Sequence, residues 1–159
     1  MDIIEGSRSA AGLRFAVVVS KYNDFVTDRL RDGAIAALTA AGADAEQLLV
    51  IRVPGAFEIP IAAQHAAESG RHHAVVCLGC VIRGETPHFE YIASAVAHGL
   101  MAASAATGVP ITFGVLTTNS VEEAIERAGE GPSNKGWEAA TAAIEMAAVV
   151  AGLTRPAGR

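Results

Sequence analysis

Apolar residues along the chain occur in two patterns, short continuous runs and longer segments in which they recur every three or four positions. The continuous runs are rich in Val, Ile and Leu, which is typical of strands buried on both faces of a parallel sheet. Each run ends at a glycine, proline or polar turn, and a segment of helical spacing follows it. We expect four strands, at residues 13–20, 47–53, 74–82 and 111–117.

The segments of helical spacing predict five helices. Apolar residues recur on one face of each segment, and glycines interrupt the pattern where several of the helices should end. Thr86 and Pro87 are expected to cap and start the central helix, and Ser120 with Glu123 forms the capping-box pattern of the next one. The expected ranges are 26–41, 57–69, 87–103, 120–128 and 134–151.

Strands that alternate with helices, each strand being a continuous apolar run, predict a parallel sheet with helices on both faces. We therefore expect one α/β domain over residues 13–153, a three-layer α/β/α sandwich around a four-stranded parallel sheet. Residues 1–12 carry only a short apolar pair, so they form either a tail or an edge strand that pairs elsewhere. Residues 154–159 are expected to be a C-terminal tail.

Composition limits the classes of function. The chain has 159 residues, of which 51% are apolar and 18% charged, so it is long enough to bury a core. A net charge of −5 without a cluster of Lys and Arg argues against binding to nucleic acid or an anionic membrane. The N-terminus lacks the apolar region of a signal peptide, and the apolar stretch 139–153 is interrupted by Glu145 and too short to span a bilayer. We expect a cytoplasmic protein that binds a small molecule.

Cys77 and Cys80 form a C-x-x-C pattern, which also occurs in redox and zinc proteins. Here the pair lies inside the third expected strand, where a spacing of three places the two sulfurs on opposite faces. The sequence holds no second C-x-x-C that would complete a zinc site. We therefore expect both thiols to act as small apolar side chains in the core.

Ligands of parallel α/β sheets bind beyond the carboxyl ends of the strands, and this rule nominates four turns. The third turn is the most suggestive, because a strand, a glycine turn and a helix start would together direct backbone N–H groups at an anion. Neither the dinucleotide-binding nor the P-loop glycine motif is present. The four turns are residues 20–23, 53–58, 81–88 and 117–119.

A few side chains in or near these turns carry chemistry. His88 is the only histidine there, and a helix dipole opposes its charged form, so a neutral ring could transfer protons; the alternative is a solvated surface histidine. Glu58 either favours a helix start or accepts hydrogen bonds from a ligand. Tyr22 either stacks on a planar ring or packs. Arg127 either complements a helix end or binds a phosphate. The other histidines show no metal-ligand spacing.

Six segments together closely resemble the lumazine synthase family in order and spacing: SKYNDFVTDRLRDGA, VPGAFEIP, GCVIRGETPHFEYI, FGVLTTN, ERAG and NKGWEAA. The resemblance implies a flavodoxin-like fold and a transferase of riboflavin biosynthesis. Such an enzyme condenses 5-amino-6-(D-ribitylamino)uracil with 3,4-dihydroxy-2-butanone 4-phosphate to give 6,7-dimethyl-8-ribityllumazine, phosphate and water. The reaction passes through an imine, loss of phosphate and ring closure, and the resemblance implies no metal or redox cofactor.

The resemblance also assigns roles to residues around the pyrimidine. Tyr22 would stack on the ring, where the family more often has Phe or Trp, and its added hydroxyl needs a partner or water. His88 would be the catalytic proton-transfer residue. The ribityl chain would be held by Ala56, Phe57 and Glu58, and the ring slot would be lined by Cys80, Val81 and Ile82.

The remaining roles concern the phosphate and the subunit boundary. Lys135 would add a positive charge near the phosphate. Phe113 lies at the amino end of its strand, so the strand-end rule does not explain it; the family uses it to cover the ring in a neighbouring subunit's site. The phosphate itself would be bound by Gly84, Glu85, Thr86 and Arg127.

The implied partners are the two small-molecule substrates and further copies of the chain. The family forms pentamers, some of which assemble into an icosahedral 60-mer, and the bend AGEGPSNKG lacks an insertion, as in the shell-forming members. Riboflavin synthase is a further candidate partner. Three alternatives stay open: an archaeal-type riboflavin synthase, a non-catalytic flavin-binding shell protein, and a thiol redox protein.

Overall fold

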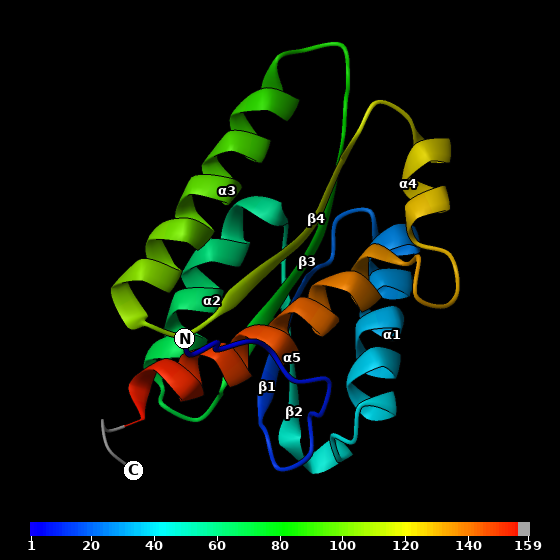
Figure 1. Ribbon diagram of the computed structural model, residues 1–159. Helices are drawn as coiled ribbons and strands as arrows, with labels where there is room; N and C mark the ends of the chain where they lie inside the picture. Colours follow the sequence, from blue (N-terminus) through cyan, green and yellow to red (C-terminus); the bar gives the residue numbers. More distant parts are fainter. Residues whose placement is uncertain (156–159) are drawn as a thin grey trace.

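A computed structural model of the protein describes residues 1–155 and contains a single sheet in that range. The strands are all parallel and lie in the order β2-β1-β3-β4 (Figure 1). The four-stranded parallel sheet expected from the sequence is confirmed, and β3 has the bounds read from its apolar run. The strands are β1 (Phe15–Ser20), β2 (Leu48–Val53), β3 (Ala74–Ile82) and β4 (Ile111–Thr118).

Within residues 1–155, five α-helices follow the strands, as the spacing of apolar residues predicts. Gly108 ends α3 with a φ of 71°, a conformation that glycine adopts without strain. The last helix reaches Thr154, where a tail was expected to begin, and the rest of that expected tail, 156–159, lies outside the described residues. The helices are α1 (Asp24–Ala40), α2 (Ile59–Glu68), α3 (His88–Thr107), α4 (Val121–Arg127) and α5 (Lys135–Thr154), with 3₁₀ turns η1 (Ala45–Gln47) and η2 (Ala56–Glu58).

The helices cover both faces of the sheet, so the chain forms the expected three layers. Figure 1 shows α2 and α3 on one side of the strands and α1 and α5 on the other. Alternate residues of β1 enter the two cores: Phe15, Val17 and Val19 face α1 and α5, whereas Ala16 and Val18 face α2 and α3. Burial on both sides explains why the strand is apolar without alternation.

The same alternation separates the two cysteines. Cys77 lies in the core under α2 and α3, and Cys80 in the core under α1 and α5, so the expectation of opposite faces is confirmed. Both thiols are free and buried. Burial raises the pKa of both, that of Cys80 to about 11, so at neutral pH they are uncharged. An uncharged thiol is a poor nucleophile, which argues against the thiol redox alternative.

Two expected helix caps are wrong in detail. Helix α3 starts at His88 with Pro87 as its N-cap, and within the described chain no side chain, Thr86 included, caps its first turn. At α4, the hydroxyl of Ser120 accepts a hydrogen bond from the backbone N–H of Glu123 at 3.2 Å, as expected. The carboxylate of Glu123, however, accepts from the N–H of Asn119 rather than from that of Ser120, so the capping box is not completed.

The N-terminal segment packs on the domain without forming a strand within the described chain. The N–H of Ala10 donates to the carbonyl of Ala41 at 2.9 Å, and Gly6 lies against Glu145 of α5. Figure 1 draws the first residues beside α5. A pairing of this segment with another chain stays a prediction.

The apolar stretch 139–153 was considered too short to span a bilayer, but helix α5, which contains it, is longer. Its 20 residues are, by length and composition alone, sufficient to cross a membrane. One third of its apolar window is buried against the sheet and α1, and the core helix of a globular protein passes the same test. Its buried face favours the core-helix interpretation.

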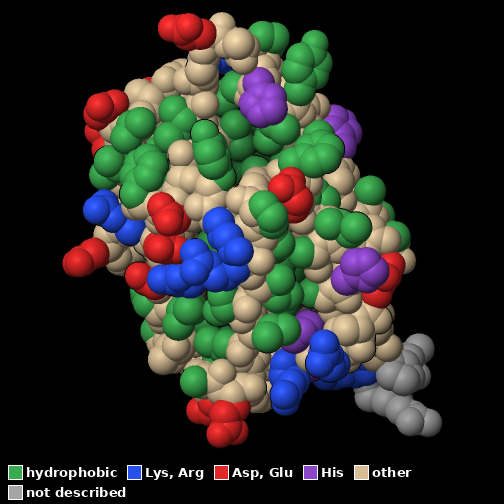
Figure 2. Space-filling model, turned by 180° about the vertical axis from the view of Figure 1, so that it is seen from behind, with side chains coloured by type: hydrophobic (Ala, Val, Ile, Leu, Met, Phe, Trp, Pro, Cys, Tyr) green, Lys and Arg blue, Asp and Glu red, His purple; other side chains and the backbone are tan. Residues whose placement is uncertain are grey.

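Large hydrophobic side chains remain exposed on the single chain. Tyr22, Tyr91 and Met101 are each more than 70% exposed, and Phe57 and Ile61 more than 60%. Seen from behind, hydrophobic side chains occupy broad areas between clusters of charge (Figure 2). Exposed apolar surface of this extent is typical of faces that bind ligands or other chains.

Candidate active site

The carboxyl ends of β1, β2 and β3 border a cavity of about 560 Å³, here called the first cavity. It lies between η2, which leads into α2, and the start of α3. Ten of the site residues predicted from the sequence line it: Tyr22, Ala56, Phe57, Glu58, Cys80, Val81, Ile82, Gly84, Thr86 and His88. The strand-end rule therefore brings together residues that are up to 66 positions apart in the chain, from Tyr22 to His88.

The other predicted residues divide into two groups. Glu85 is exposed in the same turn as Gly84 and Thr86 but is not among the residues that line the first cavity. Phe113, Arg127 and Lys135 instead line a second cavity, of about 350 Å³, along the edge strand β4. The sequence grouped Arg127 with the turn 84–86 as phosphate-binding residues, but within one chain Arg127 and this turn border different cavities.

The ends of the three strands are tied together beneath Tyr22. The N–H groups of Lys21 and Tyr22 donate to the carbonyls of Val53 and Pro54, at 2.8 and 3.0 Å. Asn23 follows in a left-handed conformation with a φ of 62°, and its amide donates to the carbonyl of Cys80 at 2.9 Å. These bonds place Tyr22 at the mouth of the first cavity.

Asn23 lines the first cavity; it lies in the nominated turn 20–23, but no role of its own was predicted for it. A sequence signal existed, because asparagine adopts the left-handed conformation more readily than most residues and often follows a strand in a turn. Its bond to a carbonyl on another strand could not be read from the sequence. The other lining residues without a predicted role are Pro54 and Gly55, which belong to the nominated turn 53–58, and Phe89 and Ile92 of α3.

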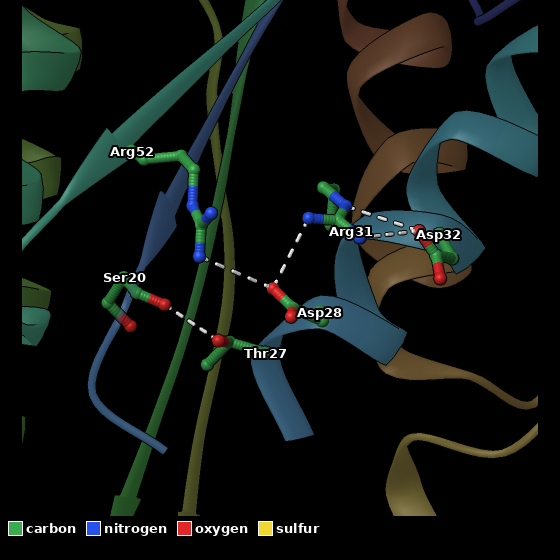
Figure 3. A network of polar contacts seen from close by, with 6 residues as sticks. All are labelled: Ser20, Thr27, Asp28, Arg31, Asp32 and Arg52. Carbon is green, nitrogen blue, oxygen red and sulfur yellow. Dashed lines mark hydrogen bonds and ion pairs between the residues drawn. The ribbon is translucent and has the colours of Figure 1, made fainter. Parts of the chain in front are cut away.

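The start of α1 is fixed to the same edge of the sheet by polar contacts (Figure 3). The hydroxyl of Thr27, which is buried, donates to the carbonyl of Ser20 at 2.6 Å. The carboxylate of Asp28 pairs with Arg31 at 3.3 Å and with Arg52 of β2 at 3.7 Å. The ion pairs are partly exposed and contribute less than about 1 kcal/mol each, so the buried hydroxyl is the stronger anchor.

The first residue of the turn between β3 and α3, Arg83, is hydrogen-bonded to the end of β4, whereas the residues after it are exposed. The N–H of Arg83 donates to the carbonyl of Thr118 at 2.8 Å, and its guanidinium donates to Asn119 at 3.0 Å and lies over the ring of Phe89. Residues 84–88 are exposed. Because no side chain among the described residues caps α3, its first N–H groups are available to an anion.

The second cavity presents two cations, each held by a carboxylate of its own helix. Arg127 donates to the carbonyl of Glu123 at 3.1 Å and lies 3.9 Å from its carboxylate. The ammonium of Lys135 donates to Glu138 at 2.8 Å. With Phe113 beside them, these cations form a surface suited to an anion next to a planar group.

The first cavity combines aromatic and apolar walls with a carboxylate and one imidazole at a helix start. This composition suits a planar polar ring that carries a hydroxylated chain, with His88 placed to transfer protons. Among residues 1–155, no cluster of His, Cys, Asp and Glu could hold a metal ion. The site is thus that of an α/β protein acting on a small organic molecule.

The sequence of the whole domain agrees with one family. The family model for 6,7-dimethyl-8-ribityllumazine synthase matches residues 12–151. A 6,7-dimethyl-8-ribityllumazine synthase of Syntrophus aciditrophicus (strain SB) is 56% identical over 144 residues, covering 91% of this chain and 94% of the relative. One of Desulfatibacillum aliphaticivorans is 51% identical over 144 residues, covering 91% and 93%. The chain belongs to the 6,7-dimethyl-8-ribityllumazine synthase family, which confirms the resemblance.

Proposed function

We propose that this protein is the transferase that condenses 5-amino-6-(D-ribitylamino)uracil with 3,4-dihydroxy-2-butanone 4-phosphate to form 6,7-dimethyl-8-ribityllumazine, phosphate and water. Membership of the family supports this reaction. The observation that carries the proposal for this chain is the first cavity, which gathers ten separately predicted residues with His88 among them.

The first cavity holds the pyrimidine substrate. Tyr22 is 73% exposed at the cavity mouth, where its ring is free to stack on the pyrimidine. Val81 and Ile82 form the apolar slot for the ring. Glu58 and the backbone of η2 bind the hydroxyl groups of the ribityl chain, because a carboxylate accepts hydrogen bonds and backbone groups both donate and accept.

His88 moves the protons that the condensation requires. Attack of the amine on the ketone releases a proton from nitrogen, and the oxygen that leaves as water needs one. An imidazole near neutral pH can accept the first and supply the second, and it can repeat this exchange during phosphate loss and ring closure. Its place at the start of α3 puts it beside the turn that binds the phosphate end of the second substrate.

The phosphate end requires both cavities. The turn at Gly84 and Thr86 offers backbone N–H groups and a hydroxyl, but the cations Arg127 and Lys135 belong to the second cavity of the same chain. We therefore propose that the second cavity of one chain closes the first cavity of its neighbour, so that Arg127, Lys135 and Phe113 come from the neighbouring subunit. The sequence assigned only Phe113 to that subunit.

Such a shared site requires a homo-oligomer, which we propose is a pentamer. The exposed aromatic and aliphatic side chains, among them Tyr91 and Met101, support an assembly in which they are covered. The uninserted bend AGEGPSNKG supports further assembly into an icosahedral shell. Riboflavin synthase is proposed as an additional partner, and the composition supports a cytoplasmic location.

The direct test is to mix the purified protein with both substrates and follow the absorbance of the lumazine together with the release of phosphate. Appearance of both in equal amounts supports the proposal. A protein that leaves these substrates unchanged but converts the lumazine would be a riboflavin synthase. One that binds flavin without any turnover would be a non-catalytic shell protein.

A further inference from the structure

Asn134 directly precedes Lys135 and is the most completely bonded polar side chain near the second cavity. It is only 2% exposed. Its amide nitrogen donates to two backbone carbonyls in different parts of the fold, that of Arg29 in α1 at 3.2 Å and that of Gly129 after α4 at 2.7 Å. A single NH₂ group thus joins α1 to the loop between α4 and α5.

The amide oxygen of Asn134 bonds to a third element, helix α5. It accepts hydrogen bonds from the N–H groups of Gly136 at 2.7 Å and Trp137 at 3.2 Å, and so caps the start of α5. A primary amide has two donor hydrogens and two acceptor lone pairs, so Asn134 uses its whole hydrogen-bonding capacity. Capping alone requires fewer hydrogen bonds, since Ser120 caps α4 by accepting a single one.

Two glycines leave the space that this amide occupies. A Cβ atom on Gly33 of α1 would collide with the side-chain amide of Asn134. One on Gly136 would collide with the backbone carbonyl of Leu30. Helices α1 and α5 therefore approach closely at this point, and the amide is fixed by packing as well as by its bonds.

The bonds of Asn134 join the two backbone segments that carry the cations of the second cavity. Arg127 is the last residue of α4, two positions before Gly129, and Lys135 is the first residue of α5. The side chains of Arg127 and Lys135 are 45% and 42% exposed, so their own packing does not fix them. Their relative position depends on the backbone that Asn134 joins.

We propose that Asn134 is a positioning residue for anion binding: it fixes Arg127 and Lys135 at the separation at which both bind the phosphate of the butanone substrate. This inference rests on the proposed function, since it takes the second cavity as the phosphate-binding half of a shared site. Asn134 itself is buried and touches no substrate. Its effect appears in the affinity for the anion.

The test compares substrate affinities in assembled protein. Asn134→Ser keeps a capping oxygen and removes the NH₂ group that donates both bonds, without adding charge. It should raise the KM for the butanone phosphate, and the inhibition constant of inorganic phosphate, about 10-fold, with the KM for the pyrimidine changed less than about twofold. If Asn134→Ser does not fold, Gly33→Ala provides the test: its added Cβ atom would displace the side-chain amide of an otherwise unchanged Asn134 and should give the same unequal change.

The control is Leu38→Ala, which leaves a cavity in the core packed against the same helix, α1. This variant should be less stable but should have unchanged KM values for both substrates. If Asn134→Ser and Gly33→Ala behave like Leu38→Ala, the inference is overturned and Asn134 is structural only. Arg127→Ala separates the two proposals. If phosphate binding is weaker in Arg127→Ala but unchanged in Asn134→Ser, only the positioning role of Asn134 is removed. If it is unchanged in both variants, the assignment of the second cavity to the phosphate is removed as well.

Discussion

His88 is the first residue of α3, and its exposed ring lines the first cavity beside the turn 84–86 that we propose binds the phosphate. If it transfers protons, its loss should affect the chemical steps more than binding, because the two substrates remain oriented in the cavity. We expect His88→Ala to lower kcat about 10- to 1000-fold with both KM values little changed. Steady-state kinetics measure this, with the exposed His65→Ala as the control. Turnover equal to wild type would remove His88 from the mechanism.

His72, which the sequence assigned to the surface or a helix, lies half-buried in the loop before β3. Both of its ring nitrogens are shielded from solvent and have no hydrogen-bond partner among the described residues. Burial, followed by the charges of Arg71, Arg14 and His73, lowers its pKa. The folded chain therefore binds a proton at His72 less readily than the unfolded chain, whose histidine has a pKa of about 6.5.

The sign of this difference predicts a loss of stability in acid. Above pH of about 6.5 the ring is neutral in both states and contributes nothing; below it the unfolded chain gains a proton first, so the free energy of unfolding falls until the folded pKa is reached. His72→Phe should lose part of the decline in stability that wild type shows between pH 7.5 and 5.5. Urea unfolding at several pH values tests this, with His65→Phe as the control. An unchanged pH dependence in His72→Phe would contradict it.

Whether a residue's role could be predicted depends on how close in the sequence its partners lie. Glu58, Tyr22 and His88 were found because each stands within a few residues of a strand end, which the sequence shows. The roles of Asn23 and Asn134 were not predicted, because their amides bond to carbonyls 57 and 105 positions away. No spacing along the chain shows such partners.

Helices α2 and α3 contact each other closely near the first cavity. A Cβ atom on Gly99 of α3 would lie 2.8 Å from the ring of Pro60 in α2, closer than packed carbons normally come. Gly99→Leu should therefore force the helices apart and lower the free energy of unfolding by about 1–3 kcal/mol. Because both helices border the cavity, the KM for the pyrimidine should rise as well.

Urea unfolding and steady-state kinetics check this pair of effects. Ala102→Leu adds the same side chain at an exposed position of α3 and serves as the control. A Gly99→Leu protein as stable as that control would show that the contact between the helices is not tight.

The elements themselves were predictable where burial and sequence pattern coincide. The run 74–82 is apolar throughout and bounded by polar residues, so β3 was read without error. The start of α2 was placed too early, because η2 has the same apolar spacing as a helix start. Thr86 was taken for a cap on its residue type, yet capping depends on a backbone geometry that Pro87 moves by one residue.

At the scale of the molecule, the parallel sheet with helices on both faces followed from the alternation of strands and helices. The separation of Arg127 from the phosphate turn did not follow. Helix α4 starts beyond the carboxyl end of β4, but Arg127 is its last residue, and a helix of seven residues carries it about 10 Å further along the axis. Strand-end reasoning applies only to the first residues after a strand.

The size of the assembly is a prediction at this scale. The bend between α4 and α5 carries no insertion, and its end is fixed by the buried amide of Asn134. We expect icosahedral shells rather than free pentamers. Light scattering and electron microscopy at neutral pH measure this, and a sample that contains only pentamers would overturn the expectation.

The proposed division of the site between two cavities makes a stronger prediction. If the second cavity of one chain completes the first cavity of the next, two inactive variants with changes in different cavities should complement each other. Phe113→Ser and His88→Ala, dissociated, mixed in equal amounts and reassembled, would form some sites in which His88 comes from one chain and Phe113 from its neighbour. Random mixing makes about a quarter of the sites wild type, so activity should exceed the average of the parents.

A second pair provides the control, because both of its changes lie in the first cavity. Glu58→Gln and His88→Ala affect residues that one chain supplies together, so every site built from their mixture lacks one or the other. That mixture should be no more active than the average of its parents. Complementation by the first pair and not by the second would establish the shared site. Equal behaviour of the two mixtures, in assemblies shown to contain both variants, would mean that each chain builds its own site.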